Sequence, residues 1–104
     1  MGTLIYGSTK MAIDFDDRTL AHMQVVFGSK LRRGESFFCS WGDAATAGGG
    51  RSSIWVSAGV PIMFHFAGTA AHQVDRAWLD TLMESANHPQ GLVVGPEGVL
   101  ANVG

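Results

Sequence analysis

The side chains best suited to metal or nucleophilic chemistry in this chain are four histidines and a single cysteine. No two histidines are four residues apart, which is the spacing of a helical zinc site. The four are His22, His65, His72 and His88. Each is therefore expected to be a surface or half-buried side chain, and neither a metal nor another cofactor is predicted.

The cysteine, Cys39, lies in a run of residues, 36–41, that alternates in the manner of a strand. The alternation places Cys39 on the face of Phe37 and Trp41, whereas His65 is expected on the opposite face of the sheet. Cys39 is therefore interpreted as a small buried hydrophobe, with a nucleophilic thiol as the alternative. No catalytic residue is predicted.

A run of glycines, Gly48, Gly49 and Gly50, precedes Arg51 and suggests phosphate binding. The run lacks the Gly-Lys-Ser/Thr ending of a P-loop, and a strand rather than a helix is expected after it. A flexible hairpin connection is the preferred interpretation, with phosphate binding as the alternative.

Cations near exposed aromatic side chains are the basis of a nucleic-acid alternative, because such surfaces hold single strands. The candidate contacts are Arg32, Arg33 and Arg51. The chain has only seven Lys and Arg residues and a net charge of −2, so no general attraction to nucleic acid or anionic lipid is expected.

Two helices are predicted, over about 17–33 and 75–87. Asp16 and Asp75 have the positions of N-caps, which also accounts for an acidic cluster around Asp16 that resembles a cation site. Gly34 is expected to supply the left-handed cap of the first helix.

Short alternating runs predict strands on both sides of the first helix and around the second. They cover residues 4–6, 11–15, 36–41, 52–57, 62–66 and 91–94. The short connections between 36 and 66 favour an antiparallel meander. The predicted fold is α+β, with a mostly antiparallel sheet, the order ββαβββαβ and two helices packed on one face. Residues 1–94 are expected to form a single domain, followed by a C-terminal tail over 95–104.

Large apolar residues lie on both faces of this predicted sheet, and two helices can cover only one face. The opposite face would carry Phe38, Ser40, Ser53, Trp55, Ser57, Met63 and His65. Aromatic residues surrounded by serines are typical of an interface with a polar rim. A charged fraction of 15% also favours self-association. The sequence predicts a homodimer or a protein partner; the alternative is that the N-terminal strands or the tail cover Phe38 and Trp55.

The location expected from the sequence is the cytoplasm. The first residues lack a signal-peptide pattern, and no apolar run is long enough to cross a bilayer. With one cysteine, an intrachain disulfide is excluded.

Five segments of the chain resemble an uncharacterised family of small actinobacterial proteins. They are residues 1–8 (MGTLIYGS), 15–22 (FDDRTLAH), 30–37 (KLRRGESF), 50–55 (GRSSIW) and 76–79 (RAWL). The resemblance extends to about Val94 and implies a single domain, but it brings no catalytic residues.

Members of that family often carry the automatic label "ATP-dependent DNA ligase". Such ligases form a lysyl-adenylate at Lys-x-Asp-Gly in a much longer domain. Here Lys10 is followed by Met-Ala-Ile and Lys30 by Leu-Arg-Arg, so neither lysine fits. The expected function is a small non-enzymatic interaction or accessory domain.

Overall fold

A computed structural model of the chain describes residues 1–42, 50–69 and 73–95. His72, Gly48, Gly49 and the tail beyond 95 lie outside the described residues. The elements are β1 (Gly2–Tyr6), β2 (Met11–Phe15), α1 (Asp17–Arg32), β3 (Phe37–Gly42), β4 (Arg51–Val56), β5 (Ile62–His65), α2 (Arg76–Ala86) and β6 (Leu92–Val94). The predicted α+β class and the order ββαβββαβ are confirmed.

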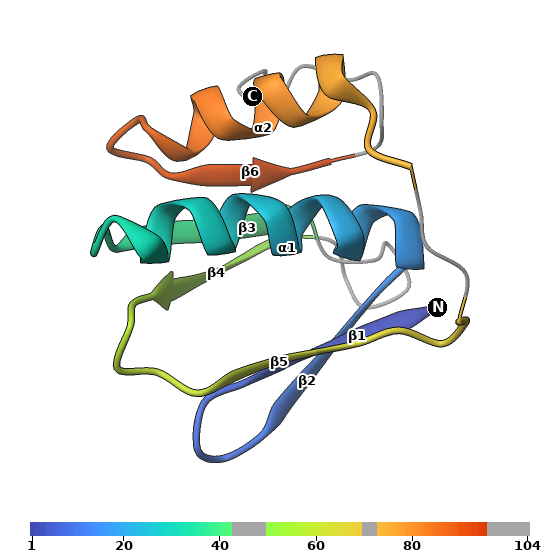
Figure 1. The fold of residues 1–104 in the computed structure, drawn as a ribbon. Helices are drawn as coiled ribbons and strands as arrows, with labels where there is room; N and C mark the ends of the chain where they lie inside the picture. Colours follow the sequence, from blue (N-terminus) through green and yellow to red (C-terminus); the bar gives the residue numbers. More distant parts are fainter. Residues whose placement is uncertain (43–49, 70–72, 96–104) are drawn as a thin grey trace.

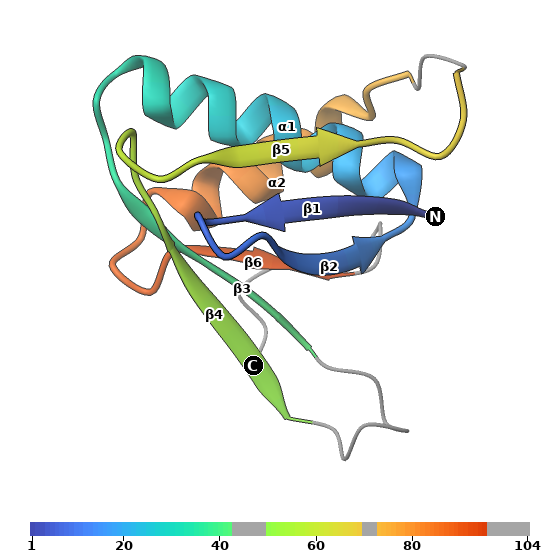
Figure 2. The same cartoon turned by 90° about the horizontal axis from the view of Figure 1, so that it is seen from below.

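The six strands form two three-stranded sheets. Sheet A has the order β2-β1-β5 and is antiparallel. Sheet B has the order β4-β3-β6, with β4 antiparallel and β6 parallel to β3. Sheet A lies below α1 in Figure 1, and β6 runs beside α2. Seen from below, the β3–β4 hairpin extends beyond the edge of sheet A (Figure 2).

The expected meander of β3, β4 and β5 is wrong, because β5 leaves sheet B and pairs with β1. In this pairing Ile62 lies opposite Tyr6 and Phe64 opposite Leu4. The N–H of Gly7 also donates to the Pro61 carbonyl at 2.8 Å, which fixes the chain just before β5. A short connection shows that two strands follow each other closely, but it does not determine which strands pair.

Side-chain and backbone caps define both ends of α1. The Asp16 carboxylate accepts bonds from the N–H and the hydroxyl of Thr19 at 2.9 and 2.8 Å. Partial burial opposes ionisation of Asp16, but these hydrogen bonds outweigh it and hold its pKa below the ordinary value. At the other end Gly34 has φ +73°, and the Glu35 N–H donates to the Lys30 carbonyl at 3.1 Å. The predicted caps of α1 are confirmed.

One apolar core fills the space between the two sheets and the helices, and Phe27 of α1 lies within it with 1% of its surface exposed. Its ring packs edge to face against Phe37 of sheet B and Phe64 of sheet A, with centroid distances of 5.3 Å in both pairs. Phe27 therefore connects the two sheets.

Cys39 belongs to this core and is fully buried. Burial raises the pKa of its thiol to about 12, so the thiol stays protonated at neutral pH. The interpretation of Cys39 as a small buried hydrophobe is confirmed.

The side chain of Lys30, near the end of α1, is buried. Its Nζ donates to Asn87 Oδ1 at 2.9 Å and pairs with Glu35 Oε1 at 2.9 Å. The same Nζ lies 6.0 Å from the ring centroid of Phe37. The hydrogen bond from Lys30 holds the pKa of Glu35 below its ordinary value. Lys30 therefore joins the ends of α1 and α2.

Candidate functional site

Two aromatic side chains, Phe38 and Trp55, lie side by side on the outer face of sheet B. They are directly opposite each other on β3 and β4. Their ring centroids are 4.9 Å apart and the ring planes meet at 67°, an edge-to-face arrangement. Phe38 is 44% exposed and Trp55 48%. An exposed pair of this size is unusual for a surface strand and marks a candidate interaction surface.

Residues of β1 and of the turn before β6 contact the backbone of this pair. The Tyr6 hydroxyl, from β1, donates to the Trp55 carbonyl. On the other side Gly91 has φ +88°, and a Cβ there would lie 2.3 Å from the Phe38 carbonyl oxygen. Only glycine allows the turn before β6 to approach Phe38 so closely. The aromatic pair therefore sits on a braced part of the sheet.

The serines predicted around the pair differ in exposure. Ser53 is exposed and Ser57 is half-buried, whereas Ser40 is only 5% exposed. The prediction of Ser40 as an exposed rim residue is wrong. Ser40 lies on the central strand, between Ser53 of β4 and Val93 of β6, and its Oγ is 2.6 Å from the Oγ of Ser53.

Met63 and His65 are exposed, but they lie on sheet A. Met63 is opposite Ile5 and His65 is opposite Thr3 on β1. The seven residues predicted for one surface are therefore divided between two sheets. The reason is again the pairing of β5 with β1, which the sequence pattern did not indicate.

The three arginines proposed for nucleic-acid or phosphate contact are exposed, and the structure does not bring them together. Arg32 and Arg33 end α1, close to the start of β3, while Arg51 is opposite Gly42 at the far end of the β3–β4 hairpin. The hairpin is about 17 Å long at about 3.4 Å per residue. Figure 2 shows its two ends well separated.

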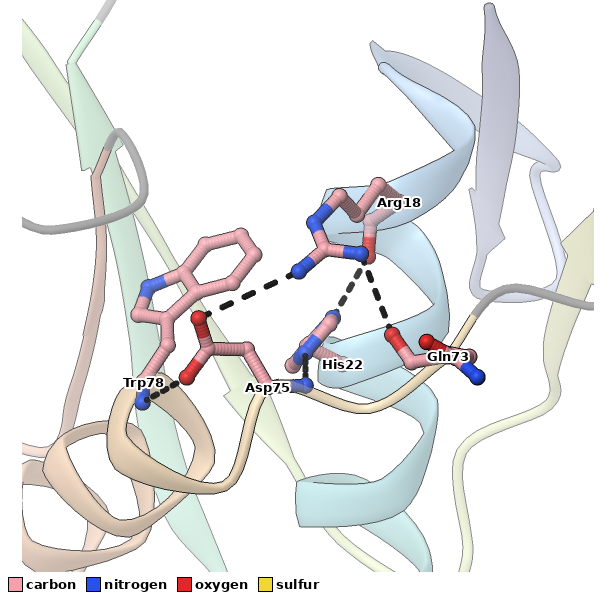
Figure 3. Close-up of polar contacts among 5 residues, drawn as sticks. All are labelled: Arg18, His22, Gln73, Asp75 and Trp78. Carbon is pink, nitrogen blue, oxygen red and sulfur yellow. Dashed lines mark hydrogen bonds and ion pairs between the residues drawn. The ribbon is translucent and has the colours of Figure 1, made fainter.

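A polar cluster between α1 and α2 was missed by the sequence analysis (Figure 3). Its centre is His22, which is fully buried. Nδ1 of His22 lies 2.8 Å from the Arg18 carbonyl, and Nε2 lies 2.9 Å from the backbone nitrogen of Asp75. A carbonyl only accepts, so we assign the ring proton to Nδ1 and let Nε2 accept the Asp75 N–H. Both nitrogens of His22 are thus bonded: Nδ1 within α1, and Nε2 to the N-cap of α2, which holds α2 to α1.

Arg18 and Trp78 complete the cluster. Arg18 Nη1 donates to the Gln73 carbonyl at 3.1 Å, and Nη2 lies 3.9 Å from Asp75 Oδ2. The Asp75 carboxylate accepts the backbone N–H of Trp78 at 3.0 Å, as predicted for an N-cap. The His22 and Trp78 rings stack with centroids 4.4 Å apart. This arrangement is a structural joint, because His22, Arg18 and the Asp75 carboxylate all bond to the chain itself. The indole N–H of Trp78 is buried and has no hydrogen-bond partner among the described residues.

A family model described as "Domain of unknown function (DUF7882)" matches residues 1–97. The chain belongs to the DUF7882 family. No curated protein and no solved structure matches it. The resemblance to an uncharacterised family is thereby confirmed. The matched part of this DUF7882 domain includes every helix and strand described above, so the aromatic pair is part of the domain itself.

Two features are absent from residues 1–42, 50–69 and 73–95 of the DUF7882 domain. Within these residues, no three His, Cys, Asp or Glu side chains are grouped so that they could hold a metal ion. Among the described helices, none is long and apolar enough to span a membrane.

Replacing His22 by phenylalanine tests the joint in this DUF7882 domain. The new ring can still stack on Trp78, but the Asp75 N–H loses its acceptor. We expect the free energy of unfolding, measured by urea denaturation, to fall by about 1–3 kcal/mol, the penalty for an unsatisfied buried group. The control is His65→Phe on the exposed face of sheet A, expected to change it by less than about 0.5 kcal/mol. Equal losses in the two variants would contradict the proposed role of His22.

Proposed function

We propose that this DUF7882 domain is a non-enzymatic interaction module that forms a symmetric homodimer through Phe38 and Trp55. The observation that supports the proposal is the pair itself, two large rings that are each about half exposed and lie on a braced sheet. Aromatic side chains contribute most of the binding energy in many interfaces. Rings that are already in mutual contact also lose little conformational entropy on binding.

A second copy of the chain is the partner that the chemistry of this surface favours. Two such pairs facing each other across a twofold axis would extend the edge-to-face packing into a cluster of four rings. The small net charge of −2 gives little repulsion between copies. The exposed Ser53 and Arg51 on β4 provide a polar rim.

Association through the face of sheet B is favoured over addition of a strand at its edge. β4 is an edge strand, which would normally offer free backbone groups to a partner strand. The Trp55 carbonyl, one residue from the end of that strand, already accepts the Tyr6 hydroxyl. A strand added along the full length of β4 would have to displace Tyr6.

Replacing Trp55 by glutamate tests the proposed homodimer. We expect light scattering to give twice the 11.0 kDa of one chain for the unchanged protein and 11.0 kDa for Trp55→Glu. A buried unpaired carboxylate at the centre of the interface would prevent association. Far-UV circular dichroism should stay unchanged, because Trp55 is not in the core.

Val25→Glu is the matched control, since Val25 is 37% exposed on α1 and the substitution adds the same charge. This variant should keep the mass of the unchanged protein. A mass of one chain for the unchanged protein, or an undiminished mass for Trp55→Glu, would rule out the homodimer proposed here.

The nucleic-acid and ligase alternatives gain no support from particular residues. Arg51 is separated from Arg32 and Arg33 by the length of the hairpin, and the Nζ of Lys30 is engaged by Glu35 and Asn87.

For the location we propose the cytoplasm, where a chain with a single, buried cysteine needs no disulfide.

A further inference from the structure

The outer face of sheet A carries a groove of about 430 Å³ at the end where β1 turns into β2. Its floor is formed by Ile5, with Ala12 beside it on β2 and Met63 beside it on β5. Pro61 lies at the end of the groove. The volume falls within the range of about 300–1,000 Å³ that is common for small-molecule sites.

The groove is apolar except at its rim. Among the residues that the structure describes, Lys10 is the one charged side chain that lines it, and no acidic residue does. Met63 is 54% exposed, and its unbranched thioether can adjust to the shape of an apolar ligand. A cation beside an apolar floor is complementary to a molecule with an anionic end and an apolar body.

The backbone of Lys10 adds a second argument. Its φ of +58° makes Lys10 the one non-glycine residue with positive φ in the described ranges. Glycine or asparagine would adopt this conformation more readily than lysine. This conformation belongs to the turn over residues 7–10, in which the Lys10 N–H donates to the Gly7 carbonyl at 3.1 Å, and it fixes the backbone of Lys10 at the groove. The bond between Gly7 and the Pro61 carbonyl holds the hairpin against β5, so the end of the groove is fixed.

The rest of the same face limits the length of the apolar floor. Thr3 is two residues from Ile5 along β1 and lies on the same face. Its hydroxyl donates to Asp14 at 3.0 Å, and it lies opposite the exposed His65. The floor is three strands wide, about 10 Å at about 4.8 Å between strands. The ligand that fits is therefore short.

We propose that this groove binds a free carboxylate with a short, unbranched apolar chain. The carboxylate lies beside the Lys10 ammonium and the chain covers Ile5, Ala12 and Met63. This site is on sheet A and is independent of the homodimer proposed for sheet B.

Titration with three probes of equal chain length tests the chemistry of the ligand. The probes are octanoate, octan-1-ol and octyltrimethylammonium, each kept below its aggregation concentration. Octanoate should shift the backbone amide resonances of Ile5, Ala12 and Met63 in a saturable manner. Octan-1-ol should bind about fivefold more weakly than octanoate, because it lacks the contribution of an exposed ion pair. Octyltrimethylammonium should bind more weakly still.

Variants at Lys10 on the rim and at Met63 beside the floor complete the test. Lys10→Asn removes the cation at a position where asparagine is well tolerated, and it should reduce octanoate affinity about fivefold while leaving octan-1-ol unaffected. Met63→Glu should weaken both. The control, Arg76→Gln, removes one exposed cation from α2 and should change neither.

Three results would overturn the proposal. They are no saturable shift with octanoate, equal affinity for octanoate and octan-1-ol, and an unchanged octanoate affinity in Lys10→Asn. Shifts of the same amides that follow protein concentration instead of octanoate would also overturn it, because they would assign the groove to a second copy of the chain.

Discussion

Phe27→Ala is expected to lower the free energy of unfolding by about 3–5 kcal/mol, the range for removal of a buried phenylalanine. The ring is 1% exposed and makes edge-to-face contacts with Phe37 and Phe64 at 5.3 Å. Its removal leaves a cavity where α1 meets both sheets. Such a loss is a large fraction of the total stability of a small domain. Urea denaturation followed by far-UV circular dichroism measures it.

The control for this variant is Val25→Ala, two positions earlier on α1. Val25 is 37% exposed, so its truncation should change the free energy of unfolding by less than about 0.5 kcal/mol. If the two variants lost similar amounts, Phe27 would not be the connection between the sheets that the packing indicates.

Gly91→Ala is expected to lower the free energy of unfolding by about 2–5 kcal/mol, from two separate causes. The left-handed backbone of φ +88° disfavours any side chain by about 1–2 kcal/mol. The added Cβ would also lie 2.3 Å from the Phe38 carbonyl oxygen and 2.8 Å from the Phe38 Cβ, and such overpacking costs about 1–3 kcal/mol. Because the carbonyl oxygen belongs to the backbone, β6 must move away from β3 to relieve the contact.

Gly34→Ala separates these two causes. Gly34 has a similar φ of +73°, but nothing lies within 4 Å of the position of its Cβ. Only the conformational penalty of about 1–2 kcal/mol should remain. Thermal or urea denaturation of both variants gives the comparison. Losses of equal size would show that the close approach of Gly91 to Phe38 is absorbed without destabilisation.

Local signals in the sequence were sufficient for the helices of this domain. An N-cap acts within three residues of itself, and a left-handed cap within one turn, so Asp16, Asp75 and Gly34 could be recognised from spacing alone. The burial of Cys39 followed from the alternation of β3. The exposure of Phe38 followed from the same alternation, and that of Trp55 from the alternation of β4.

Contacts between distant parts of the chain were not predictable in this way. The bond from Asp75 to His22 and the bond from Lys30 to Asn87 each join residues of different helices, and no local pattern indicates them. Ser40 was expected to be exposed because the parallel pairing of β6 with β3 was not foreseen. The division of the strands into two sheets depends on the same kind of long-range pairing.

The order in which the chain contributes strands to its sheets limits how it can fold. Sheet A consists of β1, β2 and the later strand β5. Sheet B consists of β3, β4 and the last strand, β6. The two sheets are therefore interleaved along the chain, and a cut between β2 and β6 leaves at least one of them without a strand. Such a topology has a high contact order, which slows folding. During synthesis sheet A has all its strands once β5 has left the ribosome, whereas sheet B can be completed only after β6 has followed.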